Sequence, residues 1–223
     1  MNLPRPLIAI AGDLFPVVTG IPLGSTLVES VHRLIDGRRR EARDILIEEL
    51  SQGRALIESI AEVDELAAIF LKYIRAAEEG TARLNLRLMA MTIRGMTHKR
   101  TLTASRFLYY AGLMATLSRE EIIAIATLYR NETLEPNRMS DKEARGRARV
   151  RTNEELVPAF FPTERHLNST LQAATRTGLV VALSGWGALV YETTPLMEEV
   201  ASLAPFRDAL EREGGFEPDP ESR

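Results

Sequence analysis

The sequence predicts a mostly α-helical protein, with an N-terminal helical bundle followed by a C-terminal winged-helix-like module that contains one β-hairpin. Two observations lead to this prediction. Apolar residues recur three and four positions apart through residues 26–130, the period of an amphipathic helix. Nearer the C-terminus, two β-branched runs flank the turn sequence Ser-Gly-Trp-Gly and precede Thr194-Pro195, a typical helix start.

This pattern divides the chain into three regions. We expect residues 1–100 to form the helical region, beginning with an apolar hairpin. We expect residues 101–208 to form the winged-helix-like module, with a basic insertion at about 131–162. Residues 209–223 are rich in glycine, proline and charge, which predicts a disordered tail.

The composition limits the classes of protein to be considered. The hydrophobic fraction of 45% allows a sizeable core, so neither disulfides nor metals are needed for stability. A net charge of −3 excludes binding to nucleic acid through overall charge, and only a local patch would serve. The chain has no cysteine, which excludes disulfides and thiol chemistry. Because the N-terminus also lacks a secretion-type cleavage pattern, we expect a cytoplasmic protein.

Residues 7–28 are apolar over nearly the length of a membrane span, with Asp13 as their one charge. Pro16 and Pro22 interrupt the segment, and prolines remove backbone donors that a lipid environment would leave unpaired. We therefore expect a buried, kinked hairpin. Contact with a membrane surface, aided by the basic residues 38–40, is the alternative.

The first half of the chain is expected to be a series of helices. The first is capped at Ser25 or Thr26, and Gly37 is expected to end or bend it. Helical spacing continues over residues 38–50 and again over residues 66–74.

Another stop and restart follows at Gly80-Thr81, before a helix that carries residues 84–91. Acidic pairs such as Glu48-Glu49 and Glu120-Glu121 have polar neighbours and are interpreted as solvated charges.

A further helix is expected over residues 104–116. Ser118 and Glu121 have the spacing of a capping box, which predicts a helix start there, running to about Arg130. The polar stretch 131–162 is expected to be irregular. Within it, residues 138–151 hold six basic and two acidic side chains, a local charge of +4.

The C-terminal elements are each marked by local signals. Thr163 is expected to cap a helix that runs to Thr177, and Gly178 is expected to end it in a left-handed conformation. Strands are predicted at residues 179–183 and 188–193. Thr194 then caps a short final helix.

In a winged-helix module, the helix that precedes the hairpin carries the recognition residues. Its apolar side should face the core, and its opposite side presents side chains that suit base edges, phosphates or a protein partner. These candidates are Arg165, Asn168, Ser169, Gln172 and Arg176. The basic stretch adds Arg145, Arg147, Arg149 and Arg151, and the hairpin tip adds Trp186. The alternative is a plain solvated face on a module that binds proteins or a second copy.

No pattern in the sequence indicates catalysis. His32, His98 and His166 lie far apart and have no carboxylate at ligand spacing, so no metal site is assigned. Residues 20–26 have the glycines of a phosphate loop at the wrong spacing and lack its lysine. We assign no catalytic residue and no cofactor, and we expect a protein that is not an enzyme.

Several of these motifs together resemble the abortive-infection alpha (Abi-alpha) family of bacterial and prophage proteins. They are residues 21–25 (Ile-Pro-Leu-Gly-Ser) leading into a helix with three arginines, Leu117-Ser118 before an apolar helix, and Thr177-Gly178-Leu179 before the strand pair. Met197 and Glu198 depart from the pattern, which places a glycine soon after the last helix start. The resemblance covers most of the chain as an order of helices and turns. It implies a role in phage defence and carries over no catalytic residue.

The sequence therefore favours a non-enzymatic helical interaction protein that acts through protein–protein contacts. Its expected partner is another protein or a second copy in a homodimer. One alternative is a winged-helix transcriptional regulator that binds duplex DNA. The other is an effector that acts on a membrane surface through residues 7–28.

Overall fold

The computed structural model describes residues 26–52, 63–135, 142–185 and 188–215. The chain separates into two compact units, Met1–Ala115 and Thr116–Arg223, which we name unit 1 and unit 2. Within the described residues the fold is mostly helical, with a two-stranded antiparallel sheet in unit 2. The predicted mostly α-helical fold class with one β-hairpin is therefore confirmed.

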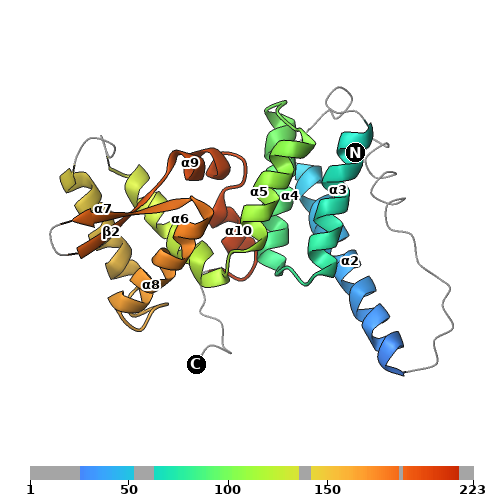
Figure 1. The fold of residues 1–223 in the computed structure, drawn as a ribbon, viewed down its shortest axis with the longest axis horizontal. Coiled ribbons are helices and arrows are strands. Elements are labelled where there is room, and N and C mark those ends of the chain that lie inside the picture. Colours follow the sequence, from blue (N-terminus) through green and yellow to red (C-terminus); the bar gives the residue numbers. More distant parts are fainter. Residues whose placement is uncertain (1–25, 53–62, 136–141, 186–187, 216–223) are drawn as a thin grey trace. The chain divides into compact units, whose positions relative to one another are not determined.

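Unit 1 is built around one buried helix (Figure 1). Its helices are α2 (Thr26–Gln52), α3 (Val63–Glu78), α4 (Arg83–His98) and α5 (Ala104–Ala115). α4 packs against the other three, and every residue from 84 to 93 is buried. The Tyr73 hydroxyl of α3 donates to the Ala42 carbonyl oxygen of α2 at 2.9 Å inside this core.

The turn between α3 and α4 follows the predicted stop and restart. Gly80 has a φ of 91°, a left-handed backbone conformation that residues other than glycine adopt only with strain. The Thr81 amide donates to the Ala76 carbonyl at 3.0 Å and closes the end of α3. α4 begins at Arg83, two residues later.

Gly37 was expected to end or bend its helix, and the structure shows that it does not end it. α2 continues through this glycine as one helix of 27 residues. A helical glycine costs about 1 kcal/mol relative to alanine. Packing of the following turns, where Ala42, Ile45 and Leu46 are buried, outweighs that cost. The ion pair between Arg39 and Glu78, at 2.7 Å, ties the same part of α2 to α3.

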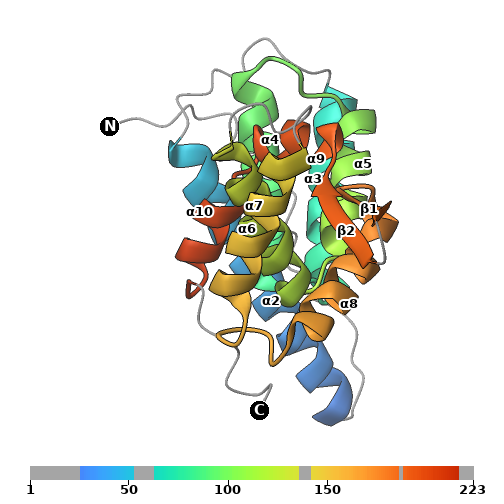
Figure 2. The same ribbon diagram turned by 90° about the vertical axis from the view of Figure 1, so that its left-hand side faces the viewer.

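Unit 2 also surrounds a single helix, α6 (Arg119–Thr133), whose residues 121–128 are all buried. α7 (Lys142–Leu156), α8 (Glu164–Ala174) and β2 pack against it, as does α10 (Phe206–Arg212). Figure 2 shows α6 and α7 side by side. The remaining elements are the 3₁₀ turn η2 (Thr175–Thr177), β1 (Val180–Gly185), β2 (Ala188–Thr193) and α9 (Pro195–Ala201).

The helix starts predicted at Ser118, Thr163 and Thr194 are confirmed, whereas the helix predicted to run to Thr177 ends at Ala174 and continues as a 3₁₀ turn. The Ser118 hydroxyl accepts from the Glu121 amide at 3.2 Å, and the Glu121 carboxylate accepts from the Ser118 amide at 2.8 Å, which completes the capping box. Thr163 and Thr194 cap α8 and α9 with their hydroxyl groups. Gly178 ends η2 with a φ of 72°.

β1 and β2 pair antiparallel, from Val180 opposite Thr193 to Gly185 opposite Ala188. Because successive side chains of a strand alternate between faces, Val180 and Tyr191 share the buried face of this hairpin. Val181, Leu183 and Val190 lie on the opposite face, which we name the outer hairpin face.

The stretch predicted to be irregular contains the helix α7, so that prediction is wrong for residues 142–156. α7 buries Ala144, Ala148, Thr152 and Leu156, four residues apart from one to the next. The helical period is present, but mostly in small residues rather than large apolar ones. Short side chains allow α7 to approach α6 closely, where the Asn131 amide donates to the Thr152 hydroxyl at 3.1 Å.

The disordered tail was predicted to begin at residue 209. This boundary is too early, because residues 209–212 form the last turn of α10. Ala209 and Leu210 are buried, and the Gly215 amide donates to the Leu210 carbonyl at 2.8 Å. Residues 216–223 lie outside the described residues, as do residues 7–25 of the N-terminal apolar segment. Within the part of the chain that is described, no helix has the length and apolar character to cross a membrane.

Candidate binding surface

The two faces predicted for the helix before the hairpin are confirmed over α8, which ends at Ala174. Leu167, Leu171 and Ala174 are buried beneath the helix. On the other side Arg165, Ser169 and Gln172 are exposed and Asn168 is half-buried, and we name these four residues the α8 face. The predicted candidates on α8 therefore lie together on one accessible surface.

The α8 face forms one wall of an open hollow of about 520 Å³. Glu164, at the start of α8, and Tyr191, on β2, complete its lining. The Tyr191 hydroxyl donates to the Gln172 side-chain oxygen at 3.1 Å and so joins the hairpin to the helix. Tyr191 was not among the predicted site residues, because its role depends on strand pairing that places it opposite α8.

Arg176 is not on the α8 face, although its spacing predicted that it would be. It lies in η2, where its guanidinium group pairs with both oxygens of Glu121 and also donates to the Ala173 carbonyl at 2.7 Å. The 3₁₀ turn breaks the α-helical period before residue 176. Arg176 therefore holds the start of α6 instead of facing a ligand.

The same contact sets the charge of Glu121. Burial of this carboxyl is the largest influence and raises its pKa. Hydrogen bonds from Arg176 and from the Ser118 amide, with the positive charge of Arg176, outweigh burial and lower the pKa overall. The interpretation of Glu121 as a solvated charge is wrong, because this side chain is buried within the capping box.

The four arginines of α7 are all engaged by carboxylates elsewhere in unit 2. Arg147 and Arg151 of α7 both pair with Glu135, which follows α6. Arg145 pairs with Glu192 of β2 at 2.7 Å. Arg149 pairs with Glu164 of α8 at 3.0 Å.

These ion pairs shift the pKa values of two carboxyl groups in opposite directions. Hydrogen bonds from Arg147 and Arg151 lower the pKa of Glu135. Burial raises the pKa of Glu192 more than its partner Arg145 lowers it.

The net charge of unit 2 as a whole is negative, opposite in sign to that of the basic stretch. Residues 116–223 hold 13 Lys and Arg against 18 Asp and Glu, a net charge of −5. Taken alone, residues 138–151 carry a positive charge. The carboxylates that pair with the α7 arginines lie outside this range of the sequence. Among the described residues, the arginines of α7 lie in ion pairs rather than in an unpaired cationic patch.

The hairpin adds apolar surface. Val181 and Leu183 are exposed on the outer hairpin face, and Leu189 is exposed on the face that it shares with Tyr191. Trp186 at the predicted tip lies outside the described residues.

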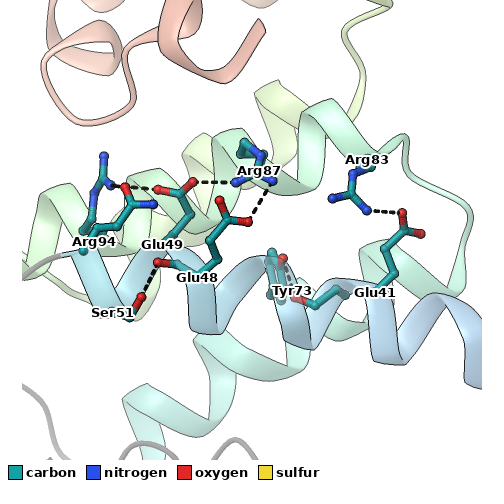
Figure 3. Close-up of polar contacts among 10 residues, drawn as sticks. Glu41, Glu48, Glu49, Ser51, Tyr73, Arg83, Arg87 and Arg94 are labelled. Carbon is teal, nitrogen blue, oxygen red and sulfur yellow. Dashed lines mark hydrogen bonds and ion pairs between the residues drawn. The ribbon is translucent and has the colours of Figure 1, made fainter. Parts of the chain in front are cut away.

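A second cluster of functional groups lies inside unit 1 (Figure 3). Glu49 of α2 is fully buried, and its two carboxylate oxygens accept from Arg87 and Arg94 of α4, each at 2.8 Å. Arg87 also donates to Glu48 at 3.0 Å. The interpretation of Glu48-Glu49 as solvated charges is therefore wrong for Glu49, because helical spacing turns it toward α4.

The buried cluster is suited to structure rather than to chemistry. A carboxylate that accepts from two guanidinium groups has little capacity to act as a general base. His32, His98 and His166 are exposed. The described ranges hold no group of three or more histidine, aspartate or glutamate side chains placed to bind a metal ion.

No known protein family, curated protein or solved structure matches this chain.

Proposed function

We propose that this chain is a non-enzymatic interaction protein whose unit 2 is a winged-helix-like module that binds another protein. The order of elements supports the winged-helix description. Three helices, α6, α7 and α8, precede a β-hairpin, and α9 follows it with proline at its first position. In this arrangement α8 stands where a recognition helix would stand.

The pairing of the α7 arginines with carboxylates favours a protein over a nucleic acid as partner. A module that binds duplex DNA needs cations that are available to phosphates, because release of counterions supplies much of its affinity. In unit 2, Arg145, Arg147, Arg149 and Arg151 each have an acidic partner within the unit. The net charge of −5 adds long-range repulsion of DNA.

The exposed surface of the hairpin favours a protein partner for a separate reason. Val181, Leu183 and Leu189 expose apolar side chains that gain free energy when another apolar surface covers them. The partner is either a different protein or a second copy in a homodimer. The phage-defence setting rests on the resemblance to the Abi-alpha family.

The competing function is DNA binding through the α8 face, and one titration separates the two. Fluorescence anisotropy of a labelled random-sequence duplex would be followed with the purified full chain at low and at moderate salt. We expect little binding and a shallow dependence on salt. Binding that weakens steeply as salt rises would indicate phosphate contacts and would replace this proposal with the regulator.

A further inference from the structure

The hollow beside α8 contains an arginine that has no carboxylate partner in the part of the chain that the structure describes, unlike the arginines of α7. The carboxylate of Glu164 on its rim is already paired with Arg149. Among the described residues no carboxylate lies within ion-pair distance of Arg165, which is exposed in the same hollow. The hollow therefore offers one uncompensated positive charge in a unit that is otherwise negative.

Neighbouring amides add to this positive character. The Gln172 side-chain oxygen is occupied by the Tyr191 hydroxyl, so its two N–H donors are left for a ligand. The Asn168 amide has no hydrogen-bond partner in the described part of the chain. Arg165, Asn168 and Gln172 together form a wall of donors that suits a carboxylate.

One exposed apolar side chain lies on the face of β2 that carries Tyr191. Leu189 lies two residues before Tyr191 and on the same face of β2, and it is 50% exposed. A ligand that reaches the α8 donors and also covers Leu189 must carry both a carboxylate and a large apolar side chain. A short protein segment has both.

Nucleic acid fits the same hollow less well. A duplex phosphate in the hollow would meet one arginine beside the carboxylate of Glu164, and the arginines of α7 are already paired with carboxylates. A single acidic side chain needs only one cation.

We infer that the hollow between α8 and β2 receives an Asp or Glu side chain of a partner protein, with an adjacent large apolar side chain of that partner covering Leu189. This inference rests on the proposed function, because it assumes that unit 2 binds protein. It adds the chemistry of the partner and assigns Arg165 as the residue that selects it.

Selection from a random linear peptide library on the full chain tests this inference. Three forms would be compared: the wild type, Arg165→Glu, and Arg75→Glu as a control with the same charge change on an exposed residue of unit 1. Glutamate suits the first turn of a helix, so Arg165→Glu should fold. Circular dichroism would check this.

We expect the wild type and the control to enrich peptides with Asp or Glu next to Leu, Ile or Phe. Arg165→Glu should lose that preference and favour Lys or Arg at the same position. Unchanged acidic preference in Arg165→Glu, enrichment without acidic residues, or no enrichment at all would overturn the inference. The proposed function would survive enrichment of other peptides, and it would fall only with salt-steep DNA binding by the wild type.

Discussion

One glutamate holds two arginines of a neighbouring helix in both units, but the two clusters differ in burial. In unit 1, Glu49 is 0% exposed and pairs with Arg87, which is 3% exposed, and with Arg94. In unit 2, Glu135 is 6% exposed, while its partners Arg147 and Arg151 are 51% and 40% exposed. The same set of charges therefore operates in two different environments.

The difference in burial separates stability from surface charge. Loss of Glu49 would leave Arg87, which is 3% exposed, with the 45% exposed Glu48 as its counter-charge, which is costly because water cannot replace the buried carboxylate. Loss of Glu135 would leave two guanidinium groups that water can reach, so stability would change little. The first cluster fixes the packing of α2 on α4. The second places a counter-charge beside two partly exposed arginines of α7.

The largest expected effect breaks the buried cluster. Glu49→Gln should lower the free energy of unfolding by about 3–5 kcal/mol, because Arg87 is then buried without its main counter-charge. Urea unfolding followed by circular dichroism measures the change. Glu48→Gln is the matched control, because its carboxylate is 45% exposed and its removal should cost about 1 kcal/mol or less. Equal losses in the two variants would refute the distinction by burial.

The next effect tests what docks α7 onto α6. If small side chains rather than the Glu135 pairs hold this helix, Ala148→Leu should lower the free energy of unfolding by about 1–3 kcal/mol through overpacking. Val150→Leu, at an exposed position of the same helix, should be nearly neutral. Thermal unfolding of both variants measures this. A neutral Ala148→Leu would mean that α7 does not pack closely on α6.

A smaller effect concerns pH. The folded-state pKa of Glu121 lies below its ordinary value of 4.5, so its charged form stabilises the fold at neutral pH. That contribution disappears as the pH falls through the folded-state pKa. Glu121→Gln keeps the capping geometry but loses the charge, so it should cost about 1 kcal/mol at neutral pH.

The difference between Glu121→Gln and the wild type should vanish in acid, below that pKa. Urea unfolding at several pH values would measure this difference in the free energy of unfolding. Glu120→Gln, at the exposed neighbouring residue, is the control. A difference that stays constant with pH would contradict the assignment.

Local signals made much of the fold predictable. Ser118, Thr163 and Thr194 mark helix starts with hydroxyl groups that bond within three residues, and the hairpin follows from alternation over two short runs. Such contacts are close in sequence, so one sequence contains them. The helix α7 was missed because its buried stripe consists mostly of alanine and threonine, which a search for large apolar residues passes over.

The candidate site was predicted only in part, for a related reason. The α8 face was found because a helix places residues at a fixed angle. The partners of the basic stretch were not found, since Glu164 and Glu192 pair with Arg149 and Arg145 across 15 and 47 positions of sequence. Nothing in a local window of charge reveals such pairs. The +4 stretch therefore predicted a cationic patch where the structure has ion pairs.

The central claim is that carboxylates of unit 2 mask the four arginines of α7 from phosphates. The most direct test replaces the three carboxylates together, as Glu135→Gln, Glu164→Gln and Glu192→Gln in one chain. The titration of random duplex DNA at several salt concentrations is then repeated with this variant. With four arginines freed, the slope of log K against log salt should steepen toward about −3 to −4, from a shallow value in the wild type. A variant as insensitive to salt as the wild type, or a wild type already as steep as the variant, would contradict the account.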